Sequence, residues 1–231
     1  VTSKDSPVYK AREAKICESC HLDNPDVRQR VGPSAGFIAS YDKSVHGIAL
    51  QKGNDDAATC SNCHGAHDMQ KGSDLRSPMN KLNIPQTCAK CHADVAHTYD
   101  ESIHGKAILK GNRDSPVCTD CHGEHQILAP TDPRSRVAAK NVSVQVCAVC
   151  HNSVPLTQKY ALAGERFKTF EDSYHGLASR AGSVEVANCA SCHGYHSIKP
   201  SSDATSTIVK ANLSVTCGKC HPGANENFGR V

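Results

Sequence analysis

The chain has 231 residues and a formal net charge of +3, with 14 cysteines, 14 histidines and no tryptophan. Its lysines and arginines form no run of five or six like charges, which gives nucleic-acid binding little support. No stretch approaches 18 apolar residues, so we expect no membrane span within these residues. The polar beginning is typical of a mature terminus from which a targeting segment has been removed.

In chain order, the sequence predicts short helices and turns. The segments 41–53 and 99–111 share a helical pattern that ends at Gly53 and Gly111. An insertion at 152–168 contains helix formers at 160–167. No alternating apolar pattern persists for more than a few residues, as a half-buried strand would require. We therefore expect a mainly α fold with much coil and little or no β structure.

The 14 cysteines form seven pairs, each with two residues between its members, and a histidine follows every pair at once. C-x-x-C-H is the attachment signature of c-type haem: the two thiols form thioethers with the porphyrin, and the histidine is the proximal ligand of the iron. We expect each motif to lie on a short helix or turn. The predicted thioether residues are Cys17, Cys20, Cys60, Cys63, Cys88, Cys91, Cys118, Cys121, Cys147, Cys150, Cys189, Cys192, Cys217 and Cys220, and the predicted proximal ligands are His21, His64, His92, His122, His151, His193 and His221.

Other interpretations of paired cysteines fit this pattern poorly. Structural zinc needs two C-x-x-C units for each ion, and seven units cannot pair off. A disulfide framework does not need the same spacing in every pair, and a thioredoxin-like site needs only one motif. The sequence therefore predicts seven covalently attached haem c groups. Because large aromatic side chains are scarce, with 4 Phe and 6 Tyr, we expect the porphyrins to fill the core.

Seven further histidines remain, one for each predicted iron. Three of them lie in S-x-H-G and three in C-H-G-x-H, whereas His97 has no repeated context. An iron with two histidine ligands uses both of its axial positions. Met69 and Met79 have no counterparts in the other repeats, so we interpret both as packing residues. The predicted distal ligands are His46, His67, His97, His104, His125, His175 and His196.

The motifs form an internal repeat in which S-x-H-G precedes C-H-G-x-H and a further C-x-x-C-H. The S-x-H-G histidine lies 14 residues before the next cysteine in all three repeats, and the last histidine of C-H-G-x-H lies 21, 22 and 21 residues before the following one. We expect a segment 1–40 with haem 1, repeat 1 at 41–98 with haems 2 and 3, repeat 2 and the insertion at 99–169 with haems 4 and 5, and repeat 3 at 170–231 with haems 6 and 7.

The arrangement of ligands within this repeat has two possible forms. If pairing closes within each repeat, His97 is left for the first haem, but ligands could also be passed from one repeat to the next. His125 lies only three residues after His122 and is rooted on the same side of that haem. We therefore expect His125 to bind a different haem from the one that His122 binds.

With these motifs in view, the chain resembles the multihaem c-type cytochromes of bacterial and archaeal anaerobic respiration. The resemblance covers about Cys17 to His221 and rests on the seven C-x-x-C-H, the S-x-H-G and the C-H-G-x-H motifs. It implies an electron-transfer protein, not an enzyme, outside the cytoplasmic membrane, in the periplasm or on the cell surface. Its redox partners would include a membrane quinol-oxidising or b-type cytochrome and a periplasmic or extracellular acceptor. Some similar proteins continue past a segment like CHPGANENF into a membrane anchor.

Two alternatives stay open. The first is a subunit of a polymeric extracellular cytochrome wire, in which a histidine could bind a haem of the next subunit. The second is a multihaem reductase of the nitrite or hydroxylamine type. Similar nitrite reductases often carry lysine in place of the motif histidine at the catalytic haem, whereas all seven motifs here carry histidine. The full set of distal histidines also argues against the reductase.

Overall fold

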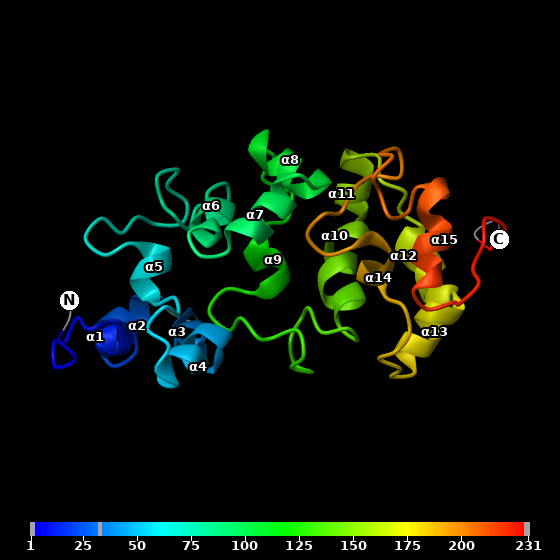
Figure 1. The fold of residues 1–231 in the computed structure, drawn as a ribbon. Helices are drawn as coiled ribbons and strands as arrows, with labels where there is room; N and C mark the ends of the chain where they lie inside the picture. Colours follow the sequence, from blue (N-terminus) through cyan, green and yellow to red (C-terminus); the bar gives the residue numbers. More distant parts are fainter. Residues whose placement is uncertain (1–2, 32–33, 229–231) are drawn as a thin grey trace. The chain divides into compact units, whose positions relative to one another are not determined.

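The structure is a computed structural model that describes residues 3–31 and 34–228, and it contains helices and loops without a strand among those residues (Figure 1). About 49% of the chain is helical, which confirms the predicted mainly α, coil-rich fold. The first part contains α1 (Lys10–His21), α2 (Pro25–Val31), α3 (Ser34–Ala39), the 3₁₀ helix η1 (Ser40–Lys43), α4 (Val45–Gln51), α5 (Cys60–His64), α6 (Ile84–Ala89), α7 (Ala93–Asp100), α8 (Ile103–Leu109) and α9 (Cys118–His122).

The later part of the chain, from residue 143 onward, begins with a π-helix and continues with short helices. It contains η2 (Ser143–Cys147), α10 (Ala148–His151), α11 (Val154–Lys159), α12 (Arg166–Asp172), α13 (Tyr174–Arg180), α14 (Cys189–His193), the 3₁₀ helix η3 (Lys210–Asn212) and α15 (Leu213–Gly218). None of the helices in the described part of the chain is long and apolar enough to cross a membrane.

The chain forms two compact units. One comprises Val1–Cys91 with Val117–Ser135, and the other comprises His92–Pro116 with Arg136–Val231. Each unit therefore combines segments of different sequence repeats. The boundaries proposed from the repeat remain predictions about sequence organisation.

The helices expected at 41–53 and 99–111 are each interrupted at a serine. Ser44 and Ser102 have extended backbones, with φ −75°, ψ 163° and φ −70°, ψ 165°. In each case the serine hydroxyl accepts a hydrogen bond of 3.0 Å from the amide of the glycine in S-x-H-G. This is an N-cap, which satisfies an amide left free at a helix start. The serine therefore starts a new helix, and the histidine of S-x-H-G is its second residue.

The insertion at 152–168 contains a short helix, but the helix does not lie over the helix formers at 160–167. Helix α11 ends at Lys159, and the next helix, α12, begins at Arg166. Between them Ala161 adopts the left-handed conformation, with φ 50°, which a residue with a Cβ rarely occupies within a helix. The Tyr160 hydroxyl donates hydrogen bonds to Asn112 and Asp114 at 2.9 and 2.7 Å, which fixes this turn.

A π-helix marks the place where the interval from C-H-G-x-H to the next cysteine changes. The interval from C-H-G-x-H to the next cysteine is one residue longer in repeat 2, and the extra residue lies between Asn141 and Cys147. The corresponding segments before Cys88 and Cys217 are α-helical, whereas Ser143–Cys147 forms η2. A π turn takes up one additional residue in a helix. The irregular count of 22 residues therefore has a direct structural cause.

Asparagine residues hold the loops before the second motif of repeats 1 and 3. The Asn83 side chain donates to the carbonyls of Leu75 and Ser77 at 2.8 and 2.9 Å. In repeat 3, Asn212 makes the equivalent bonds at 3.2 and 2.9 Å. These bonds satisfy loop carbonyls that have no partner in regular structure. They explain why NIPQTC and NLSVTC share their first residue.

Alanine is the commonest residue among the buried apolar side chains in the described part of the chain. They include Ala14, Ala57, Ala96, Ala138, Ala148 and Ala190, and the buried aromatic residues among those described are Tyr99 and Phe167. Small side chains remove little apolar area from water. The side chains therefore supply a limited core, as the scarcity of aromatics predicts. Met69 is 52% exposed, so its interpretation as a packing residue is wrong.

Candidate haem-binding sites

The motif helices α5, α9 and α14 each contain one complete C-x-x-C-H and end at a glycine. Gly65, Gly123 and Gly194 have φ values of 81°, 83° and 79°, in the left-handed region that favours glycine. This reversal ends the helix immediately after the motif histidine. The last histidine of C-H-G-x-H therefore leaves in a loop, outside the helix that carries the cysteines.

Three pairs of histidine rings face one another at nearly the same separation. The ring centroids are 6.0 Å apart for His64 and His125. They are 6.3 Å apart for His104 and His151, and 6.1 Å apart for His175 and His221. Each pair joins a motif histidine to a histidine from S-x-H-G or C-H-G-x-H.

This separation fits a metal ion between the rings. A metal–nitrogen bond is about 2 Å long and a ring centroid lies about 1 Å beyond its nitrogen, so two rings on opposite sides of one metal ion have centroids about 6 Å apart. The buried Nδ1 of His125 also lacks a hydrogen-bond partner among the described residues. The residues present therefore fit a haem iron with two axial histidines, attached through the adjacent cysteines.

The buried members of these pairs are held neutral. Burial, with a smaller contribution from His151, lowers the pKa of His104 to about 4. Burial also lowers the pKa of His64, with His125 adding to the shift. A neutral imidazole is the form that binds a metal ion, so both rings are in the ligand form at neutral pH.

The other predicted ligands differ in their exposure and in the elements that carry them. Half-buried His46 lies on α4, His122 ends α9, and half-buried His196 follows α14 in a loop. His67 and His97 are exposed, and Nε2 of His97 lies 3.7 Å from the Glu101 carboxylate. Among the described residues, His21, His67, His97 and His193 lie in no ring contact with another histidine.

The members of a facing pair can come from one repeat or from two successive repeats. His104 faces a histidine of its own repeat, and so does His175. His125 instead faces His64 of the preceding repeat. The three facing pairs therefore do not all lie within one repeat, and the ligand role of His97 stays a prediction.

The first cysteines of successive motifs meet at three junctions. The thiol of Cys60 lies beside that of Cys17, the thiol of Cys88 beside that of Cys118, and the thiol of Cys189 beside that of Cys147. Since each thiol is a predicted point of haem attachment, the contacts bring attachment points of consecutive motifs together.

At two junctions, the residue four positions before the first cysteine of one motif caps the helix of the next motif. Sequence reasoning missed this role. The Glu13 carboxylate, on α1, accepts hydrogen bonds from the Ser61 amide at 2.6 Å and the Thr59 hydroxyl at 2.9 Å. The Ser143 hydroxyl, in η2, accepts one from the Cys189 amide at 3.1 Å. Both contacts satisfy free donors at a helix start. Glu13 and Ser143 lie at the same offset from Cys17 and Cys147, and this shared offset is the sequence feature that could have identified them.

The middle junction uses an ion pair in place of such a cap. Lys81 Nζ lies 3.1 Å from the Asp120 carboxylate, on α9. A second contact lies at the last motif, where the ring centroids of Phe228 and His221 are 5.0 Å apart. Neither contact follows from the motifs alone.

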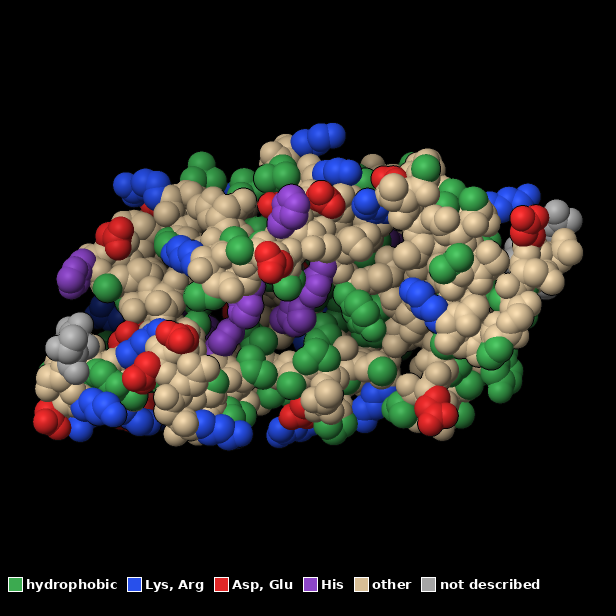
Figure 2. Space-filling view, viewed as in Figure 1, with side chains coloured by type: hydrophobic (Ala, Val, Ile, Leu, Met, Phe, Trp, Pro, Cys, Tyr) green, Lys and Arg blue, Asp and Glu red, His purple; other side chains and the backbone are tan. Residues whose placement is uncertain are grey.

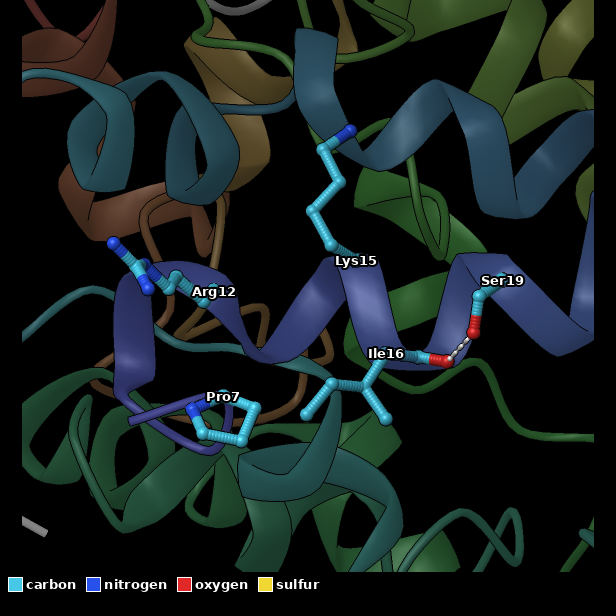
Figure 3. A pocket seen from close by; sticks show the side chains of 5 residues that line it. All are labelled: Pro7, Arg12, Lys15, Ile16 and Ser19. Atoms are coloured by element: carbon cyan, nitrogen blue, oxygen red, sulfur yellow. Dashed lines mark hydrogen bonds between the residues drawn. The ribbon is translucent and has the colours of Figure 1, made fainter. Parts of the chain in front are cut away.

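One surface pocket has none of the paired histidines in its lining. It has a volume of about 550 Å³ and is lined by Pro7, Arg12, Lys15, Ile16 and Ser19 beside α1 (Figure 3). Arg12 donates to the Asp5 carbonyl and Lys15 pairs with Glu18 at 2.7 Å, so both cations have partners. Figure 2 shows that some histidine side chains reach the surface on the face in view, with acidic and basic residues mixed over it. The chemistry of the site lies in the histidine pairs and not in this pocket.

The fold and these pairs define a class: the chain is similar to multihaem c-type cytochromes. Two curated relatives support the resemblance expected from the motifs. No family model matches the chain, and no solved structure matches it.

The particular relatives are both bacterial. The chain is 25% identical over 173 residues to the cytochrome c-type protein NrfB of Escherichia coli O6:H1, a match that covers 69% of this chain and 78% of NrfB. It is 31% identical over 93 residues to the multiheme cytochrome MtrA of Shewanella baltica, covering 40% of this chain. The chain spans only 21% of MtrA.

Proposed function

We propose that this protein is a heptahaem c-type cytochrome that moves electrons along a chain of low-spin haems, each with two axial histidines. The three facing histidine pairs carry this proposal, because their 6.0, 6.3 and 6.1 Å separations suit two ligands on one iron. Each haem iron takes up one electron when it is reduced from the ferric to the ferrous state. An iron with both axial positions filled has none for a substrate, which favours electron transfer over catalysis.

The roles of the residues follow from their positions. The cysteines of the seven motifs hold the groups, and the histidine after each pair is the first axial ligand. The other seven histidines are candidates for the second ligand, and for six of these the repeated sequence context supports the role. The thiol contacts between consecutive motifs favour short distances between neighbouring haems. Short distances allow electrons to pass in sequence order.

The partners and location are proposed from the resemblance to respiratory cytochromes. A membrane quinol-linked cytochrome would donate electrons, and a periplasmic or extracellular acceptor would receive them in anaerobic respiration. Seven haems add 14 propionates and, when ferric, seven positive charges, so the formal charge falls from +3 to about −4 oxidised and about −11 reduced. We expect docking surfaces of the partners to be basic and docking to weaken with salt.

A haem count combined with electron paramagnetic resonance (EPR) of the oxidised protein tests the proposal. Mass spectrometry should find seven haems, reductive titration should consume seven electrons, and the EPR spectrum should be dominated by low-spin ferric iron. A His104→Ala variant is the control for detection, since it should convert one haem to the high-spin form. A stoichiometric high-spin signal in the unmodified protein would contradict the carrier and favour a reductase. Electron microscopy would reveal filaments if the protein were a polymeric wire.

A further inference from the structure

The three facing histidine pairs differ in origin and in ring orientation. His64 and His125 come from successive repeats, and their ring planes are 6° apart. His104 and His151 come from one repeat and are tilted by 57°. The third pair, in repeat 3, is tilted by 52°. Origin and orientation therefore change together.

We propose that the chain builds two classes of bis-histidine haem. One class takes its second ligand from C-H-G-x-H of the following repeat and has parallel rings, as at His64 and His125. The other takes it from S-x-H-G of the same repeat and has tilted rings, as at His104 with His151 and at His175 with His221. This inference rests on the proposed function, because it requires that these histidines bind haem iron.

The tilted geometry has a common structural cause. The second-ligand histidine is the second residue of a helix capped by Ser102 or Ser173, whose backbone angles agree within about 5°. The serine hydroxyl fixes each helix start by accepting from the Gly105 or Gly176 amide at 3.0 or 3.2 Å. Because the same local structure presents the ring in both repeats, nearly equal tilts of 57° and 52° result.

The parallel geometry has a different origin. His125 lies in a loop beyond the left-handed Gly123, not on a capped helix. The loop is held by a backbone hydrogen bond of 2.8 Å from the Val45 amide to the Ile127 carbonyl. Its Nδ1 is buried and has no hydrogen-bond partner among the described residues, so no bond to that atom turns the ring. The loop backbone therefore sets the orientation, independently of the serine cap.

Ring orientation determines the electronic state of a low-spin ferric haem. Each axial imidazole interacts with the iron d orbital that lies perpendicular to its plane. Two parallel rings act on the same orbital and split the pair of d orbitals strongly, which gives a rhombic EPR spectrum. Two strongly tilted rings act on both orbitals and leave them close in energy, which gives a highly anisotropic spectrum. The geometry of the axial ligands is thus one of the protein's means of tuning haem.

Matched ligand variants test this assignment in the complete haem-loaded protein. His125→Ala should remove one haem equivalent from the rhombic signal and add one high-spin haem. His104→Ala should remove one haem equivalent from the highly anisotropic signal. Added imidazole should return each variant to the low-spin state. If His125→Ala does not yield folded protein, His125→Met keeps an axial ligand and should replace one rhombic haem with a methionine-ligated one.

The outcomes separate this inference from the proposed function. If both variants become high-spin at the expense of the same signal, the two-class inference is wrong while histidine ligation stands. The inference is also overturned if His125→Ala depletes the highly anisotropic signal. If neither variant gives a high-spin haem, these histidines are not ligands, and the axial-ligand assignment of the proposed function fails with it.

Discussion

Helices α8 and α13 carry the same S-x-H-G motif but are attached to the rest of their unit differently. In repeat 2 the Tyr99 hydroxyl donates to the Pro116 carbonyl at 2.8 Å, and the Ile103 amide donates to the Ile198 carbonyl at 2.9 Å. In repeat 3 the position of Tyr99 is occupied by Phe170, which has no hydroxyl. Tyr174, at the start of α13, is 80% exposed.

The comparison distinguishes the residues that form the helix of the second-ligand histidine from the contacts that hold this helix in place. Both helices share the serine cap and the glycine, so a local sequence of four residues is sufficient to present the histidine. The tyrosine contact appears again in repeat 1, where Tyr41 donates to the Ala58 carbonyl at 2.6 Å. The carbonyl that accepts lies two residues before a motif cysteine in both cases. The tyrosine therefore ties the second-ligand helix to the next haem attachment segment.

The largest effect is expected from Gly105→Ala and Gly176→Ala, which test the feature that the two helices share. A Cβ at Gly105 would collide with the Tyr99 carbonyl oxygen and lie 2.6 Å from the Asp100 Cα, and a Cβ at Gly176 would meet Phe170 and Glu171 in the same way. Because backbone must move, we expect a loss of about 1–3 kcal/mol in stability. Each variant should also show one high-spin haem by EPR.

Gly36→Ala is the control for this pair, since a Cβ there meets nothing within 4 Å. It should leave the denaturant midpoint and the spin state unchanged within error. Low-spin spectra and wild-type midpoints for both glycine variants would contradict a close-packed role for this glycine.

An intermediate effect is expected from removing the serine cap. Ser102 is 1% exposed, so Ser102→Ala leaves the Gly105 amide buried without its partner and should cost about 1 kcal/mol. Ser173 is less buried, so Ser173→Ala should cost less. The denaturant midpoint measures both. Equal losses would show that burial of the cap does not distinguish the two repeats.

The smallest effect is expected from exchanging the aromatic residues. Tyr99→Phe removes one hydrogen bond from a half-buried carbonyl and should lower stability by about 0.5 kcal/mol. Phe170→Tyr places a hydroxyl at the equivalent position in repeat 3 and should raise stability by up to about 0.5 kcal/mol. The reciprocal pair is compared by denaturant midpoint and by the rate at which cyanide displaces a histidine. A gain from Tyr99→Phe would contradict the role given to this contact.

Sequence reasoning reached the fold class because its signals are local. The absence of strand periodicity and the spacing of Gly53 and Gly111 describe short helices without any long-range information. The serine that divides each expected helix was visible in S-x-H-G, but its side chain can either continue a helix or cap one. Only the backbone geometry decides between these.

The motifs mark all six histidines of the three facing pairs, but they do not say which of these face one another. That His125 faces His64 across a repeat boundary could not be predicted from them. That choice depends on how the chain returns after Gly123, which is a tertiary property. The caps from Glu13 and Ser143 escaped notice because glutamate and serine are ordinary residues whose roles arise only where two motif helices meet.

The π-helix at Ser143–Cys147 has a consequence for how repeats of this kind diverge. In an α-helix, one inserted residue rotates every later side chain by about 100° around the axis. Such a rotation would point Cys147, Cys150 and His151 in a new direction. The π turn absorbs the extra residue before Ala148, and His151 still faces His104. The additional residue therefore leaves the direction of the later side chains around the helix axis unchanged. Ser143, within the widened turn, also accepts a hydrogen bond from the next motif helix.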